Sequence, residues 1–266
     1  MACRWDSITV PTVTAMRDFE DSTLWRVSEF ERIRQETGSS GYIPLAGATI
    51  LPTTLLADLR NLQRDTGGGE LLESIAACMR HHEPALFYLQ HEELVWPVTL
   101  FPSQMIYHSP RDMVQATPAT LADLKLISVE PPGVRPPGHW LFDRVAQAEH
   151  YRPLAPLLWA VAIHGPRGAL LNEIGGTAAY RAIKNLSDEG LVAPGAIGSA
   201  AERLRRESVS LRQMSTWPGL SVERASRLLN GLYLASALLV TRTHPAARAE
   251  PGFMRGLFGA GRRPRR

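Results

Sequence analysis

Residues 169–192 read ALLNEIGGTAAYRAIKNLSDEGLV and residues 210–240 read SLRQMSTWPGLSVERASRLLNGLYLASALLV, and the two stretches repeat one pattern. Each predicts a short helix, a breaker containing glycine, a second amphipathic helix and an apolar strand-like exit. When residue 183 is aligned with residue 229, four apolar positions coincide: Ala179, Ala182, Ile183 and Leu186 match Ala225, Leu228, Leu229 and Leu232. Their spacing of i, i+3, i+4 and i+7 is the stripe that a core-facing helix requires. The sequence therefore predicts two copies of one module, with Ile183 and Leu229 both buried.

Residues 170–194 and 211–242 resemble the winged-helix superfamily in their order of apolar helix, turn, amphipathic helix and wing strand. The resemblance implies a fold that binds DNA in many regulators and serves only protein–protein contacts in others. If the modules bound DNA, the second helix of each would enter the major groove. The exposed side chains of these helices would be Ala178, Arg181, Lys184, Asn185 and Asp188 in the first copy, and Glu223, Arg224, Arg227 and Asn230 in the second.

The second copy is the better candidate for reading DNA. Arg224, Arg227 and Asn230 can donate hydrogen bonds to base edges or phosphates. The first copy is rich in alanine and carries Asp188, which is a poor neighbour for a phosphate. The alternative interpretation of both faces is a solvated helix surface without a nucleic-acid partner.

The N-terminal half predicts an α+β domain. Helical periodicity covers residues 22–37, 53–64 and 70–81, and aromatic and β-branched residues then fill 84–90, 94–101, 104–108 and 124–129. Helices followed by a strand meander indicate one antiparallel sheet with a helical layer. Residues 94–101 are apolar on both strand faces, which fits a strand packed on both sides. Pro97 instead favours an exposed edge that receives a partner, because proline cannot donate to a central ladder.

The best domain boundary is the stretch 130–138, EPPGVRPPG, in which four prolines and two glycines exclude a helix or a central strand. A helical pattern resumes at 139–149, and the apolar stretch 151–163 is expected to be a buried helix. The predicted organisation is an α+β domain at 1–129, a linker at 130–138, winged-helix-like modules at 139–198 and 199–246, and a flexible basic tail at 247–266.

Positive charge is concentrated in the tail. Residues 251–266 hold five arginines and no acidic residue, which leaves 24 basic and 26 acidic side chains in the rest of the chain. Because the chain outside residues 251–266 is nearly neutral, it is not expected to present a broad basic surface for binding nucleic acid. The tail is expected to be disordered when free. It either docks on a protein or an anionic membrane surface, or serves as a solubilising basic end without a partner. Its candidate interaction residues are Phe253, Phe258, Arg262, Arg263, Arg265 and Arg266.

No motif in the sequence predicts catalysis. Asp65-Thr66-Gly67 has no second copy and no preceding apolar strand, so it is interpreted as a helix end rather than a protease triplet. His81-His82-Glu83 and His91-Glu92-Glu93 lack metal-ligand spacing. Gly67-Gly68-Gly69 lacks the lysine of a phosphate-binding loop. Cys3 and Cys78 form no disulfide framework, and Cys78 is expected to be buried. The sequence therefore predicts no enzyme, no cofactor and no metal.

These observations predict a bacterial, cytoplasmic regulatory or adaptor protein that acts through protein–protein interaction. Arginine supplies 27 of the 29 basic residues, which is typical of a GC-rich bacterial genome. No apolar run approaches the ~18 residues that span a membrane, and the N-terminus lacks the pattern of a signal peptide. The expected partner is another protein. The alternative function is a DNA-binding transcriptional regulator that uses the second helices of the two modules. Oligomeric state is not determined by the sequence.

Overall fold

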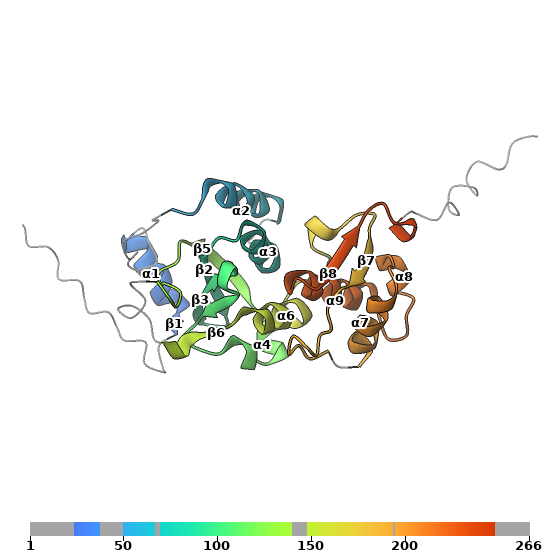
Figure 1. Cartoon of the computed structure of the whole chain (residues 1–266). Coiled ribbons are helices and arrows are strands. Elements are labelled where there is room, and N and C mark those ends of the chain that lie inside the picture. The colour runs from blue at the N-terminus through green and yellow to red at the C-terminus, as the bar shows by residue number, and fades with distance from the viewer. Residues whose placement is uncertain (1–23, 38–49, 67–69, 140–147, 194, 248–266) are drawn as a thin grey trace, which may run out of the picture.

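The computed structural model describes residues 24–37, 50–66, 70–139, 148–193 and 195–247 (Figure 1). Its larger sheet is antiparallel, with strand order β5-β2-β3-β4-β6 and with β1 paired to the start of β3. The strands are β1 (Trp25–Arg26), β2 (Ala85–His91), β3 (Leu94–Phe101), β4 (Ile106–His108), β5 (Lys125–Glu130) and β6 (Tyr151–Pro153). The predicted mixed α+β class, the meander at 84–108 and the strand at 124–129 are confirmed.

Helices pack on both faces of this sheet, as the alternation of its side chains requires. Phe87 and Leu89 of β2 join the larger core together with the buried leucines of α2 (Thr53–Thr66) and α3 (Leu71–His81). Leu86 and Tyr88 point the other way and pack against Phe30 of α1 (Val27–Thr37). The helices predicted at 53–64 and 70–81 are confirmed. The helix predicted at 22–37 begins only at Val27, because Trp25–Arg26 pair with β3 as the strand β1. Cys78 of α3 is buried as predicted, and burial raises the pKa of its thiol to about 12.

Pro97 lies in the centre of the sheet rather than at its edge, since β3 has β2 on one side and both β1 and β4 on the other. The pairing with β1 ends at Val95, and the pairing with β4 begins at Thr99. Around Pro97, β2 is therefore the one pairing partner among the described strands. A proline is tolerated there because its missing N–H falls in the interval between two partners. The interpretation of 94–101 as a strand packed on both sides is confirmed by its burial.

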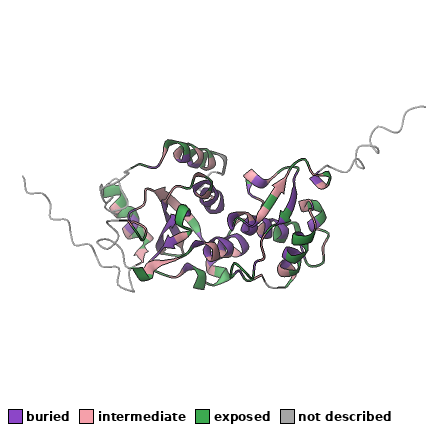
Figure 2. Ribbon diagram, in the orientation of Figure 1, coloured by how far each residue is buried: buried purple, intermediate pink, exposed green. Residues whose placement is uncertain are grey.

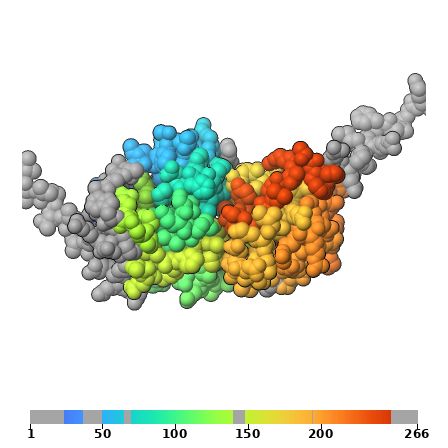
Figure 3. Space-filling view, in the orientation of Figure 1, coloured from blue at the N-terminus to red at the C-terminus, as the bar shows by residue number. Residues whose placement is uncertain are grey.

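The helix α6 (Leu154–His164) joins the two parts of the fold. It follows β6 directly and packs against β4, the 3-10 turn at Met113–Gln115 and α4 (Pro118–Ala122) on one side, and against α9 (Val222–Leu234) on the other. It is apolar all round, with seven of its eleven residues buried. Figure 2 shows α6 and α9 as mostly buried ribbons, and Figure 3 shows the two parts of the molecule lying directly against each other. The larger core is continuous from Leu51 to Ala237.

The C-terminal part consists of β7 (Ala179–Ala182), α7 (Ala196–Arg206), α8 (Leu211–Met214), α9 and β8 (Leu238–Thr241), with 3-10 turns at Asn172–Ile174 and Pro245–Ala247. α8 begins with a capping box between Ser210 and Gln213. The side chain of Ser221 accepts a hydrogen bond from the N–H of Arg224 at the start of α9, as its sequence position predicts. The second copy of the predicted repeat therefore has its helix, turn, helix and strand in the expected order.

The first copy is different, and the helix predicted at 177–186 is wrong. Of these residues, Ala179–Ala182 form β7, which pairs antiparallel with β8, and the predicted exit strand at 190–192 is a loop. Tyr180 is fully buried, its hydroxyl donates to the carbonyl of Ile174 at 2.7 Å, and its backbone bridges to Val209. Pairing with a strand almost 60 residues away overrides the helical spacing of the alanines. Ile183 is consequently 59% exposed rather than buried, and the two stretches belong to one unit.

The stretch 130–138 packs onto the fold. Val134 is buried, and the hydroxyl of Tyr151 donates a hydrogen bond to the carbonyl of Arg135. β6, which follows this stretch, adds to the N-terminal sheet. The division of the chain at 130–138 stays a prediction. The predicted helix at 139–149 lies almost wholly outside the described residues, apart from a 3-10 turn at Ala148–His150, and the tail beyond Ala247 lies outside them as well.

Leu229 and Leu239 make a matched pair for testing this fold. Leu229 of α9 is fully buried, whereas Leu239 of β8 is 48% exposed. We expect Leu229→Ala to lower the free energy of unfolding by about 2–5 kcal/mol, because it leaves a cavity in the core. Leu239→Ala should stay within about 1 kcal/mol of the parent. Urea denaturation of both variants measures the difference, and equal losses would contradict the inward direction of Leu229.

His108 of β4 predicts a pH dependence of stability. Burial, with smaller contributions from His150 and Arg152, lowers the pKa of its imidazole from 6.5 to about 4. The neutral ring is therefore favoured in the folded chain. Its contribution is fully present above pH 6.5, where the unfolded chain is also neutral, and is lost as the pH falls through the folded pKa. We expect the unfolding free energy of the parent to decrease by roughly 3 kcal/mol through this group between pH 6.5 and 4.

The variant His108→Gln should flatten that part of the stability profile. His82 is exposed at the end of α3 and has a left-handed backbone that asparagine tolerates, so His82→Asn is the control and should keep the parent slope. Chemical denaturation at half-unit steps of pH measures both profiles. A parent slope that survives in His108→Gln would assign the pH dependence to other groups.

Candidate interaction surface

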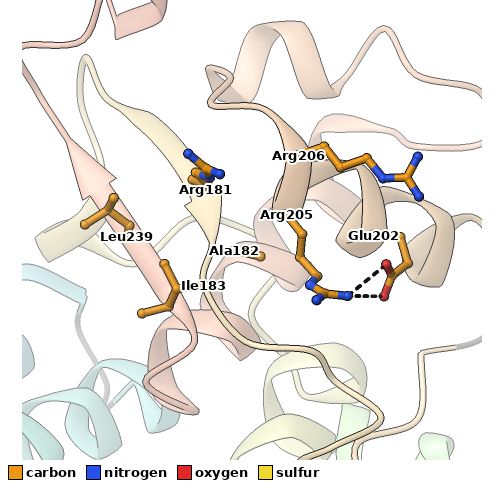
Figure 4. A pocket seen from close by; sticks show the side chains of 7 residues that line it. All are labelled: Arg181, Ala182, Ile183, Glu202, Arg205, Arg206 and Leu239. Carbon is orange, nitrogen blue, oxygen red and sulfur yellow. Dashed lines mark hydrogen bonds and ion pairs between the residues drawn. The ribbon is translucent and has the colours of Figure 1, made fainter.

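A groove of about 480 Å³ lies beside the β7–β8 ribbon, between the ribbon and α7 (Figure 4). Its lining residues are Arg181, Ala182, Ile183, Glu202, Arg205, Arg206 and Leu239. Three of the seven are arginines and two are large aliphatic residues, so the groove is both basic and partly apolar. This combination suits the binding of a ligand that carries carboxylates and an apolar side chain.

The alternation of side chains along a strand determines which residues of the ribbon face the groove. Arg181 is paired directly with Leu239 across the two strands, so their side chains share one face. Ile183 follows two residues after Arg181 and continues that face, whereas Tyr180 and Ala182 point into the core. Ile183 and Leu239 are 59% and 48% exposed. The outer face of the ribbon therefore presents a positive charge beside two aliphatic side chains.

The helix α7 supplies the other wall. Ile197, Ala200, Ala201 and Leu204 form its buried stripe, at the spacing of one helix face. Glu202, Arg205 and Arg206 lie on the exposed faces of the same helix. Arg205 forms an ion pair with Glu202 at 3.2 Å, and Arg181 and Arg206 have no ion pair with another described residue. Two guanidinium groups of the groove are thus available to an anionic partner.

The sequence prediction for the reading face of α9 is contradicted by its packing. Asn230 is completely buried, where its amide accepts from the N–H of Leu171 and donates to the carbonyl of Ala169, both at 2.9 Å. Arg227 is half-buried and donates to the carbonyls of Ile163 and Gly165 at the end of α6. Arg227 therefore ties α9 to the end of α6, and Asn230 ties α9 to the loop at 169–171. Arg224 alone of the three is exposed, and its guanidinium donates to the carbonyl of Gly219.

The residues predicted to form one exposed helix face in the first copy do not share a face, because the segment is a strand followed by a turn. Ala178 is buried, Lys184 pairs with Glu189 at 3.2 Å, and Asn185 donates to Asp188 at 3.2 Å. Arg181 alone enters the groove. The other candidate residues of the tail, Phe253, Phe258, Arg262, Arg263, Arg265 and Arg266, lie outside the described residues.

Sequence reasoning missed α7, and with it Arg205 and Arg206. The signal was present, since Ile197, Ala200, Ala201 and Leu204 have helical spacing and three arginines fill the last turn. The meeting of Arg181 with α7 had no sequence signal, because it depends on β7 being a strand.

A second charged cluster lies where the 165–173 loop meets α2 and α3. Arg167 pairs with Glu70 and, at 2.9 Å, with Glu73, while Arg80 pairs with Asp58 and Glu173. The hydrogen bond from His81 lowers the pKa of Asp58, and burial raises the pKa of Glu73. Within the described residues, no three His, Cys, Asp or Glu side chains are grouped closely enough to hold a metal ion. The cluster holds four carboxylates and two guanidinium groups, and its ion pairs tie the loop to α2 and α3, which indicates a structural joint.

Comparisons with protein-family models, with curated proteins and with solved structures found no match for this chain. Within the residues that the structure describes, every helix is too short or too polar to cross a bilayer.

The role of Asn230 as a structural amide is testable. Asn230→Ala would leave the N–H of Leu171 and the carbonyl of Ala169 buried without a partner, so we expect a loss of about 2 kcal/mol or more in unfolding free energy. Asn185 makes its hydrogen bonds in an exposed turn, and Asn185→Ala should cost less than about 1 kcal/mol. Denaturant titration of the two variants gives the comparison. An unfolding free energy of Asn230→Ala equal to that of the parent would contradict the structural role of Asn230.

Proposed function

We propose that this chain is a non-catalytic interaction protein that binds another protein through the groove between the β7–β8 ribbon and α7. The observation that carries the proposal is the combination of exposed Ile183 and Leu239 with Arg181 and Arg206 in one groove. Interfaces between proteins are enriched in arginine and bury apolar side chains at their centre. A regulatory or adaptor role agrees with such a surface.

The alternative, a DNA-binding regulator, loses its main support in the packing of α9. After its first turn, this helix is buried almost throughout, and Tyr233 and Arg227 are half-buried. A recognition helix must expose several adjacent side chains to enter the major groove. The order of α8, turn, α9 and β8 keeps the likeness to a winged helix, and membership of that superfamily stays a prediction. Within such a fold, the exposed surface lies on the ribbon and α7 instead of on the second helix of the turn.

Site-specific photocrosslinking tests the proposed function. The full chain, carrying benzoylphenylalanine at position 183 or at position 239, is expressed in its source cells and irradiated. We expect one protein adduct of the same mass from both positions, because both side chains line the same groove. The adduct should resist nuclease and disappear with protease.

Positions 192 and 222 provide the controls. Val192 and Val222 are 77% and 57% exposed and lie outside the groove lining. The same photoreactive group at these positions should not form that adduct. A nuclease-sensitive adduct from 183 and 239 would favour the DNA-binding alternative. Equal adducts from all four positions, or none from the groove, would contradict an interaction at this surface.

A further inference from the structure

We infer that the groove takes an extended acidic segment of its partner, with carboxylates on the arginines and an aliphatic side chain on Ile183 and Leu239. This inference rests on the proposed function and names the chemistry of the partner. The charge of the groove, its exposed apolar side chains and the shape of its two walls favour a protein segment as the ligand.

The charge of the groove selects an anion. Arg181 comes from β7, and Arg205 and Arg206 come from the last turn of α7, so three guanidinium groups from two elements flank one groove. Glu202 neutralises Arg205 through the ion pair at 3.2 Å. The remaining excess belongs to Arg181 on the ribbon and to Arg206 on α7, whose side chain extends away from the ribbon (Figure 4). Arg181 can therefore hold a carboxylate of the segment through its planar fork, and Arg206 adds a second positive charge at the α7 wall.

The apolar part of the groove selects against a ligand that carries charge alone. Leu239 and Ile183 lie side by side on the outer face of the ribbon, next to Arg181. Covering them removes aliphatic surface from water, which stabilises a complex only if the partner offers an apolar side chain. An acidic segment with aliphatic residues between its carboxylates meets both requirements. A peptide that has only carboxylates would leave the side chains of Ile183 and Leu239 exposed to solvent.

The lining residues also disfavour a nucleic acid. Single strands bind where successive bases stack on aromatic side chains, and the groove lining contains no aromatic residue. Glu202 projects from the α7 wall beside the arginines and would repel a continuous line of phosphates. A peptide can instead place an uncharged residue opposite this carboxylate.

The ribbon determines the conformation and length of the segment. β7 and β8 contribute four residues each, which at ~3.3 Å per residue gives a wall of about 13 Å. An extended peptide of about four residues matches this length. The segment expected in the partner therefore carries both acidic and aliphatic residues within about four positions.

Fluorescence anisotropy with the full chain tests the inference. The probes are a labelled peptide GSDLEVELDSG, a second peptide with amides in place of the four carboxylates (GSNLQVQLNSG), a third with serines in place of the aliphatic residues (GSDSESESDSG), and a 12-nucleotide oligothymidylate. We expect the first peptide to bind at least about tenfold more tightly than the other three, since each loses the charge, the apolar or the peptide part of the recognition. Its affinity should fall as salt is raised.

Variants of the chain assign binding to the groove. Arg181→Glu/Arg206→Glu and Ile183→Ser/Leu239→Ser should each weaken the first peptide at least about tenfold. Arg212→Glu/Arg224→Glu and Val192→Ser/Val222→Ser change exposed residues outside the groove and should bind like the parent. Thermal melting of each variant confirms that the fold is retained, which is expected because the altered side chains are exposed.

The outcomes separate this inference from the proposed function. Peptides that bind alike, or none that binds, overturn the acidic segment, even if the crosslinked adduct at positions 183 and 239 is found. Binding of the oligothymidylate at the strength of the first peptide overturns it in favour of a nucleic acid. Binding of the first peptide that survives both groove variants overturns the location. Absence of the site-specific adduct removes the proposed function itself.

Discussion

The packing of α6 against both halves of the chain is the contact on which the rest of the structure depends. One side of the helix completes the core beneath β4 and α4, and the other side contacts α9. The close approach to α9 requires Gly231, because a Cβ atom at that position would lie 2.7 Å from the ring of Trp159. The indole nitrogen of Trp159 donates to the carbonyl of Val192 at 2.9 Å, so the ring is fixed in place. A helix that is apolar all round is stable only when neighbours cover it on every side.

Polar contacts at the same joint complete the packing of the two parts. The guanidinium of Arg227 donates to the last carbonyls of α6, which have no partner within the helix. Asn230 holds both neighbours of Leu170 in the loop, and Arg167 carries that loop to the carboxylates of α3. Each of these groups is wholly or largely buried and is satisfied by a partner from another element. If one partner were removed, the other would remain buried and unpaired. The loss of unfolding free energy would therefore exceed the net stabilisation that the pair provides.

This joint also decides which surfaces are free to act. α9 is used on most of its sides by α6, by the 169–171 loop and by α7, so its polar residues serve the fold. The ribbon and α7 lie on the far side from α6 and keep their outer faces exposed (Figure 2). The functional surface of the C-terminal part is thereby displaced from the second helix of the helix–turn–helix to its neighbours. Arg224 marks the first turn, where α9 is still exposed, and it is the one member of the predicted reading face that is free of the core.

The sequence by itself determined the elements whose signals are local. The cap at Ser221, the buried stripe of α9, the apolar helix α6 and the strands of the meander follow from spacing and end residues, and these were predicted. It did not determine β7, because Ala179, Ala182 and Ile183 fit a helix by their spacing and become a strand only by pairing with β8. The tertiary structure alone decided that Asn230 is buried, that Ile183 is exposed, and that Arg181 and Arg206 line one groove. Such facts depend on contacts between residues far apart in the chain, whose pairing energy outweighs local propensity and leaves no periodic trace in the sequence.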